Sequence, residues 1–117
     1  MLHFLLVRAA MAAAQTFPPP GIDCQRKTVV YYKAGPNWDK ARDYTEPHLR
    51  YLADLLKKGV ASEAGPNDDK GGLLVYNSTD PAEVDAWVLK DPLVANGVVV
   101  WTRSGWTRCV VAPPSGR

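Results

Sequence analysis

The amino-acid sequence predicts a single α+β domain with a ferredoxin-like βαββαβ fold. The chain has 117 residues, which suits one domain. Hydrophobic residues make up 46% and charged residues 22%, as in an ordinary globular protein with a packed core. Two strand-helix-strand units follow each other along the chain. Right-handed crossovers between their strands give the sheet order 4-1-3-2, with both helices on one face.

The first strand and the first helix are predicted within residues 27–58. Residues 27–33 are rich in β-branched and aromatic side chains and end at a turn signal, which is typical of a strand. Leucines recur at helical spacing across residues 44–58 and predict a helix. Thr45 is the expected N-cap, because Pro47 then falls in the first turn, where its missing N–H costs nothing.

A hairpin is expected next. Gly59 stands where the cap at the C-terminus of the first helix belongs. Residues 60–64 and residues 72–76 have the composition of short strands, and a glycine-, proline- and aspartate-rich run separates them. The two strands therefore form a hairpin.

The second helix has the clearest start signal in the chain. Asp80 is the expected N-cap, Pro81 suits the first helical position, and Glu83 has the spacing of a capping box. The helix is expected to end near Asp91, since Pro92 disfavours the α conformation of the residue before it.

The last strand is predicted at residues 98–103, after a connection formed by residues 93–97. Ser104–Gly105 predict a break in this strand, and residues 106–111 are expected to continue it beyond a bulge.

The two ends of the chain are predicted to lie outside the domain, which spans residues 27–111. Residues 1–26 form an N-terminal tail with a proline-rich linker, and residues 112–117 form a C-terminal tail. Residues 1–14 are apolar or small and resemble a signal peptide, which predicts an exported or periplasmic protein. Arg8 in the middle of this apolar run favours the alternative, a cytoplasmic protein, and it excludes a membrane span there.

Composition and spacing exclude several classes of function. The net charge is only +2, and basic residues are scattered among acidic ones, so nucleic-acid binding is not expected. Two histidines and two cysteines are too few and too far apart for a zinc site. Neither a nucleophile with a partner nor a glycine-rich phosphate loop can be identified. We therefore expect no metal and no cofactor.

The topology brings candidate functional residues together at one pole of the domain. The two helices are antiparallel to each other, so the start of the first and the end of the second meet beside the turns of the sheet. The segments that converge there are Gly35–Trp38, His48, Ala64–Pro66, Gly71–Gly72 and Asp91–Pro92.

His48 and Asp91 are the candidate catalytic pair. A position near a helix start disfavours the imidazolium, so His48 is expected to stay neutral and able to accept a proton. Asp91 at a helix C-terminus opposes the helix dipole and needs a hydrogen-bond donor. The alternatives are that His48 is a core residue on a leucine-lined face and that Asp91 merely ends a helix before proline.

Five short segments, in this order, resemble the YciI-like (YCII-related) family over about residues 28–106. They are His48–Leu52, Gly59, Ala64–Pro66, Gly71–Val75 and Asp91–Gly97. The resemblance implies a dimeric α+β barrel and an active site with a histidine and an aspartate, which correspond to His48 and Asp91. Some relatives act on chlorinated or hydroxylated aromatic rings. Leu93 and Ser104–Trp106 depart from the family pattern, which puts the shape of the pocket in doubt rather than the fold.

Two classes of function follow. The first is a small cofactor-free enzyme, lyase-, isomerase- or hydrolase-like, in which His48 acts as general base or acid on a small aromatic or cyclic substrate and Asp91 orients the imidazole. The second is a non-catalytic module that binds a small molecule in the same pocket. The candidate pocket residues are Trp38, Tyr51, Gly65, Pro66 and Gly72.

Two further expectations concern assembly and a disulfide. Both faces of the strands at residues 27–33 and 98–103 are apolar, and helices cover only one face, which predicts a homodimer with sheet packed on sheet. Cys24 and Cys109 flank neighbouring strands at the pole opposite the candidate site. They are expected to form a disulfide if the chain is exported and to remain thiols in the cytoplasm.

Overall fold

The computed structural model of the chain describes residues 17–114, so the predicted signal peptide at residues 1–14 lies outside the described residues. Four strands, three α-helices and one 3-10 turn make up this part of the chain. In chain order they are β1 (Ile22–Ala34), η1 (Trp38–Lys40), α2 (Ala41–Lys57), β2 (Ala61–Asn67), β3 (Gly71–Tyr76), α3 (Pro81–Leu89), α4 (Pro92–Ala95) and β4 (Val99–Val111).

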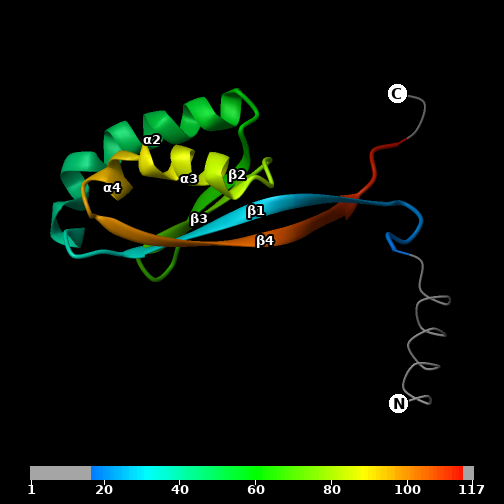
Figure 1. The fold of residues 1–117 in the computed structure, drawn as a ribbon, viewed down its shortest axis with the longest axis horizontal. Helices are drawn as coiled ribbons and strands as arrows, with labels where there is room; N and C mark the ends of the chain where they lie inside the picture. The colour runs from blue at the N-terminus through cyan, green and yellow to red at the C-terminus, as the bar shows by residue number, and fades with distance from the viewer. Residues whose placement is uncertain (1–16, 115–117) are drawn as a thin grey trace, which may run out of the picture. The chain divides into compact units, whose positions relative to one another are not determined.

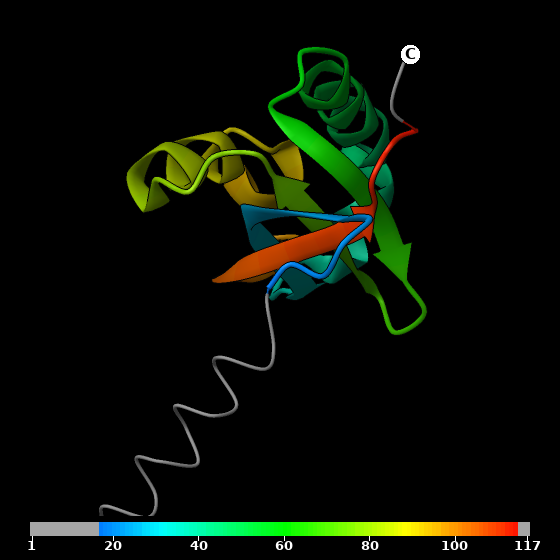
Figure 2. The ribbon, with the colours of Figure 1, turned by 90° about the vertical axis from the view of Figure 1, so that its right-hand side faces the viewer.

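The strands form one sheet in the order β2-β3-β1-β4, which is the order predicted from the sequence. Strand β3 pairs antiparallel with β1, from Thr28 opposite Tyr76 to Lys33 opposite Gly71, and β2 pairs antiparallel with β3. The helices lie on the same side of the sheet (Figures 1 and 2). The predicted α+β, ferredoxin-like fold is therefore confirmed.

Alternation along the central strands directs one set of side chains towards the helices. In β1 these are Val30 and Tyr32, which are buried, and in β3 they are Leu74 and Tyr76. Helices α2 and α3 complete the core with small and branched side chains, chiefly Leu55, Val84 and Val88. Core-facing side chains thus recur every second residue in the strands and about every 3.6 residues in the helices, and the two sets pack against each other.

Helix α2 begins earlier than predicted, and Thr45 is not its N-cap. The 3-10 turn η1 leads directly into the helix at Ala41, so Thr45 lies inside it and donates from Oγ1 to the Ala41 carbonyl at 2.8 Å. Pro47 also lies inside the helix rather than in its first turn. The prediction was wrong because a cap-like threonine also satisfies its hydroxyl within a helix, by bonding the carbonyl four residues back.

The end of α2 is the one predicted. Gly59 has a φ of 73°, a conformation that favours glycine, and its N–H donates to the Leu56 carbonyl at 3.2 Å. The N–H of Val60 reaches the Leu55 carbonyl at 2.9 Å. These two bonds are a Schellman motif, which stops the helix and turns the chain into β2.

Helix α3 begins at the predicted cap, but Glu83 does not complete a capping box. The Asp80 side chain accepts from the Ala82 N–H at 3.0 Å, and Pro81 occupies the first turn. The N–H of Asp80 itself donates to Ser78 Oγ at 3.1 Å, so serine supplies the acceptor that was assigned to Glu83.

The bounds of strands β1 and β4 differ from the prediction. Strand β1 begins at Ile22, before the predicted residue 27, and β4 runs from Val99 to Val111 without the break expected at Ser104–Gly105. The segment at residues 93–97, predicted as a connection, contains the short helix α4. The described chain divides into two compact units, residues 26–107 and residues 17–25 with 108–114. None of the described helices is long and apolar enough to cross a membrane.

The smaller unit contains the two cysteines. Cys24 and Cys109 are joined by a disulfide, with their Cα atoms 4.1 Å apart. In the same unit the Ala112 N–H donates to the Gly21 carbonyl at 2.8 Å. The disulfide therefore closes a loop over a sequence separation of 85 residues.

Replacing both cysteines, as Cys24→Ser with Cys109→Ser, is expected to lower the free energy of unfolding. Cross-linking residues so far apart in sequence contributes up to about 4 to 5 kcal/mol in the chain-entropy model. Urea unfolding with and without reductant measures the effect, because the double variant must show no response to reductant. Two free thiols in the unreduced, unfolded wild-type protein would contradict the disulfide.

Candidate active site

The site is built around Asp91, whose side chain is fully buried. Pro92 holds the preceding residue in an extended conformation, with a φ of -67° and a ψ of 125° at Asp91. Asp91 follows the C-terminal end of α3 and is the N-cap of α4. The sequence analysis had placed Asp91 at a helix C-terminus, where the dipole opposes a negative charge. Asp91 does follow the end of α3, and its N–H donates to the Val88 carbonyl at 3.1 Å. It is also the N-cap of α4, whose peptide N–H groups point towards it.

Three donors from three different elements meet the Asp91 carboxylate. The Leu93 N–H of α4 donates to Oδ1 at 3.0 Å, and the Tyr32 hydroxyl of β1 donates to Oδ2 at 2.8 Å. His48 Nδ1 of α2 lies 2.8 Å from Oδ1 and 2.9 Å from Oδ2. An N–H or O–H thus stabilises the charge on each oxygen.

His48 joins this carboxylate to a cavity. Because Asp91 accepts from Nδ1, the proton of a neutral ring is on Nδ1, and the lone pair is on Nε2. Tyr76 Oη is the only buried side-chain polar atom among the described residues that lacks a partner. Nε2 has no hydrogen bond within this part of the chain and is not one of its buried unpartnered atoms, so it is exposed, and His48 lines the cavity described below. The arrangement leaves a basic nitrogen facing that space.

The expected reason for a neutral His48 does not hold. Helix α2 begins at Ala41, so His48 lies about two turns inside the helix, and the dipole effect is confined to the first turn. The side chain of His48 is 12% exposed.

Three phenols lie within range of the Asp91 charge and remain neutral. Burial raises the pKa of Tyr32 far above its ordinary value, and the charge of Asp91 and the hydrogen bond to it act in the same direction. Burial likewise raises the pKa of Tyr76, and it raises the pKa of Tyr51 to about 12. Unfolded tyrosine ionises near pH 10, so this part of the fold loses stability as the pH rises above that value.

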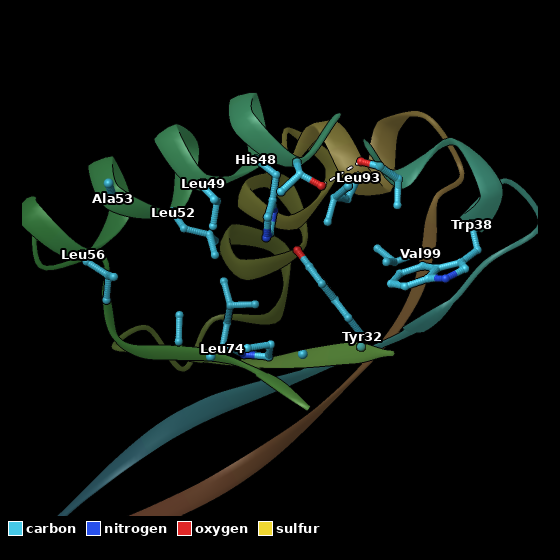
Figure 3. A pocket seen from close by; sticks show the side chains of 17 residues that line it. Tyr32, Trp38, His48, Leu49, Leu52, Ala53, Leu56, Leu74, Leu93 and Val99 are labelled. Carbon is cyan, nitrogen blue, oxygen red and sulfur yellow. Dashed lines mark hydrogen bonds between the residues drawn. The ribbon is translucent and has the colours of Figure 1, made fainter. Parts of the chain in front are cut away.

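A cavity of about 450 Å³ lies between α2 and the sheet (Figure 3). His48 projects into it from the helix, and Tyr32 rises towards His48 from β1. Its lining residues are mostly apolar. They are Tyr32, Trp38, Ala41, Thr45, His48, Leu49, Leu52, Ala53, Leu56, Ala64, Gly65, Pro66, Gly71, Gly72, Leu74, Leu93 and Val99.

Of the pocket residues proposed from the sequence, four line the cavity and one does not. Trp38, Gly65, Pro66 and Gly72 are among the lining residues. Tyr51 is not, because its hydroxyl donates to the Trp87 carbonyl at 2.6 Å and so ties α2 to α3. Spacing alone placed Tyr51 near His48, since residues three apart share a helix face, but its long side chain reaches the second helix instead.

The sequence analysis missed Tyr32. It identified Tyr32 only as an apolar member of one strand face, although alternation within β1 already separates it from Tyr31. The register with Gly72 in β3 sets it beside the glycine turns of the candidate pole. The Tyr32 hydroxyl lies on the helix-facing side of the strand end, and a buried tyrosine hydroxyl usually has a hydrogen-bond partner. This was the sequence signal that could have identified Tyr32 as a site residue.

A family model described as the YCII-related domain matches residues 26–103. The chain is similar to a solved structure of 5-chloro-2-hydroxyhydroquinone dehydrochlorinase from Burkholderia phenoliruptrix AC1100 in complex with 2,5-dihydroxybenzoquinone. The TM-score is 0.56 and the identity 22%, over 68% of this chain and 92% of that one. No curated protein matches. In residues 17–114, no group of three or more His, Cys, Asp and Glu side chains is arranged to hold a metal ion.

Tyr32→Phe tests the buried carboxylate. Removing the hydroxyl takes one of its donors from a buried charge, and we expect a loss of about 1.5 to 3 kcal/mol in the free energy of unfolding by urea. The matched control is Tyr51→Phe, which loses a neutral hydrogen bond worth about 1 kcal/mol. The Nδ1 proton resonance of His48 should shift in the first variant only. Equal losses with an unmoved resonance would show that Tyr32 does not act through Asp91.

Proposed function

The chain belongs to the YCII-related domain family, and on that premise we propose that it is a small cofactor-free enzyme in which His48 transfers a proton to and from a small aromatic or cyclic substrate. Asp91 orients the imidazole and stabilises its charged form. The single observation that supports the proposal is that the two nitrogens of the His48 ring have different environments. Nδ1 is bound by a buried carboxylate, and Nε2 faces a cavity.

The chemistry follows from that difference. An acidic O–H or C–H of the substrate within reach of Nε2 gives up its proton, and the electron pair remains on the substrate as an enolate or phenolate. The imidazolium so formed is paired with Asp91. It then returns the proton to another position of the substrate, as in an isomerisation, or to a departing group, as in an elimination. No redox step is involved, so atoms and charge balance without a co-reactant.

The similar solved structure is that of a dehydrochlorinase, an enzyme named for the loss of HCl from a chlorinated hydroxyhydroquinone. Its identity of 22% indicates a shared fold and not a shared substrate. It nevertheless suggests a first assay, since removal of HCl from such a ring needs the proton transfer that is proposed for His48.

His48→Gln is expected to lower kcat/KM for chloride release from a chlorinated phenol or chlorinated naphthol by about 10² to 10⁴, the usual contribution of a general base. Asp91→Asn is expected to give a smaller but clear loss. The control is Arg50→Gln, an exposed change on the same helix. A chloride electrode records the rates across pH.

Two results would contradict the catalytic role. One is activity in His48→Gln that remains proportional to the folded fraction. The other is binding of these compounds without turnover in the wild-type protein, which would favour the alternative of a non-catalytic binding module.

We also propose that the chain acts as a homodimer through the face of the sheet that the helices leave open. Tyr31 and Val100 alternate with core-facing neighbours in their strands, and their exposed fractions are 39% and 49%. In β3 the partner of Tyr31 is Leu73, which extends the apolar surface. An antiparallel sheet face in contact with water is normally polar, so a second copy is the expected cover.

Tyr31→Lys is expected to shift the protein from dimer to monomer in light scattering at micromolar concentration, because a lysine on a buried sheet face meets no partner. Leu89→Lys is the matched control. Leu89 is also apolar and is 59% exposed, but it lies on α3. A wild-type monomer would refute the dimer, and loss of the dimer in the control alone would assign the interface to the helices.

We also propose that the protein is exported. The Cys24–Cys109 disulfide supports it, because structural disulfides persist in oxidising compartments and are rare in the cytosol.

A further inference from the structure

The walls of the cavity carry no formal charge. None of its lining residues is a lysine, arginine, aspartate or glutamate. The nearest carboxylate, Asp91, is fully buried behind His48 and already accepts from three residues. A carboxylate or phosphate group on a ligand would therefore enter an apolar space without a cation to pair with, at a large cost in desolvation.

The polar atoms of the wall are few and mostly engaged. The hydroxyl of Tyr32 donates to Asp91, and that of Thr45 donates to the Ala41 carbonyl. Among the lining side chains, His48 Nε2 and the Trp38 indole N–H make no hydrogen bond with another described residue, so these two atoms are left to meet a ligand. A ligand with many hydroxyl groups would leave most of them unpaired.

The cavity is long and apolar on one side of His48. His48, Leu52 and Leu56 follow one another at intervals of four residues along α2, and Figure 3 shows their side chains one after another along the helix, with Leu74 on the opposite side of the cavity. Eight residues of helix span about 12 Å. A cavity of about 150 Å³ is enough to hold benzene, whereas this one measures about 450 Å³. One hydroxylated ring would leave most of this space unfilled.

From these observations we propose that the cavity selects uncharged, mainly apolar ligands larger than one ring, such as fused-ring phenols, with their single acidic hydroxyl at His48. The inference rests on the site described under the proposed function. It goes further by naming the substrate class, a bicyclic or alkyl-extended phenol, and by excluding aromatic acids.

The probes are 2-naphthol, 2-naphthoate and phenol, titrated calorimetrically into the full-length protein at pH 7. The naphthol is expected to bind about tenfold or more tightly than the naphthoate, because the naphthoate charge has no partner. It is also expected to bind about tenfold or more tightly than phenol, because the second ring adds buried apolar area. Naphthoate binding as tight as naphthol binding, or no naphthol binding at millimolar concentration, would overturn the inference.

A positive charge introduced at the edge of the cavity tests whether the lack of a cation causes the weak binding of anions. Leu56 lines the cavity and is partly exposed, so Leu56→Arg is compatible with folding and places a cation at the apolar end. We expect the variant to bind 2-naphthoate at least about tenfold more tightly than the wild type does. Leu89→Arg, an exposed change outside the cavity lining, is the control and should leave the preference unaltered. An unchanged preference in Leu56→Arg would refute the electrostatic cause.

The experiments test the ligand preference and the catalytic role of His48 independently, so either proposal can be refuted without the other. If 2-naphthol binds with the stated preference while His48→Gln does not alter turnover, the ligand class stands and the catalytic role of His48 does not. If the preference is absent while turnover depends on His48, the catalytic role stands and the ligand class does not.

Discussion

The buried carboxylate of Asp91 is the interaction on which the site depends. A charge with no exposure to water is tolerated only where donors surround it, and here each donor comes from a different element: Tyr32 from β1, His48 from α2 and the Leu93 N–H from α4. The same group therefore connects the central strand with two helices and fixes the tautomer of the imidazole. Under the proposed function, stability and chemistry share one residue, so a change at Asp91 is expected to affect both.

The local sequence around Asp91 explains how the chain can deliver a carboxylate to that point. Pro92 prevents α3 from continuing, and Asp91 takes the extended conformation that this requires. A new helix then starts with Asp91 as its cap, which provides the Leu93 N–H as a donor. The break between α3 and α4 thus places the Asp91 carboxylate in the interior, and the start of α4 supplies one of its hydrogen bonds.

Much of this arrangement could be predicted from the sequence, because strand alternation, cap residues and crossover handedness are local or topological rules. The sheet order, the cap at Asp80 and the end of α2 at Gly59 follow from them. The start of α2 could not be predicted, since Thr45 satisfies its hydroxyl either as a cap or within a helix. Tyr32 was missed for a different reason. Alternation assigns it to the core face, but only the packing of α2 and α4 against that face shows that its hydroxyl meets a carboxylate.

The uncharged cavity and the buried charge behind it are two parts of the proposed mechanism. With His48 neutral, the site carries the negative charge of Asp91, so a neutral ligand enters without repulsion and an anion does not. When Nε2 takes the proton, the negative charge of the substrate appears directly opposite a new imidazolium. The imidazolium is in turn held by Asp91. The apolar wall around this pair strengthens the attraction. The favourable charge pairing therefore arises only as the reaction proceeds, which is the condition under which binding energy lowers the barrier rather than the ground state.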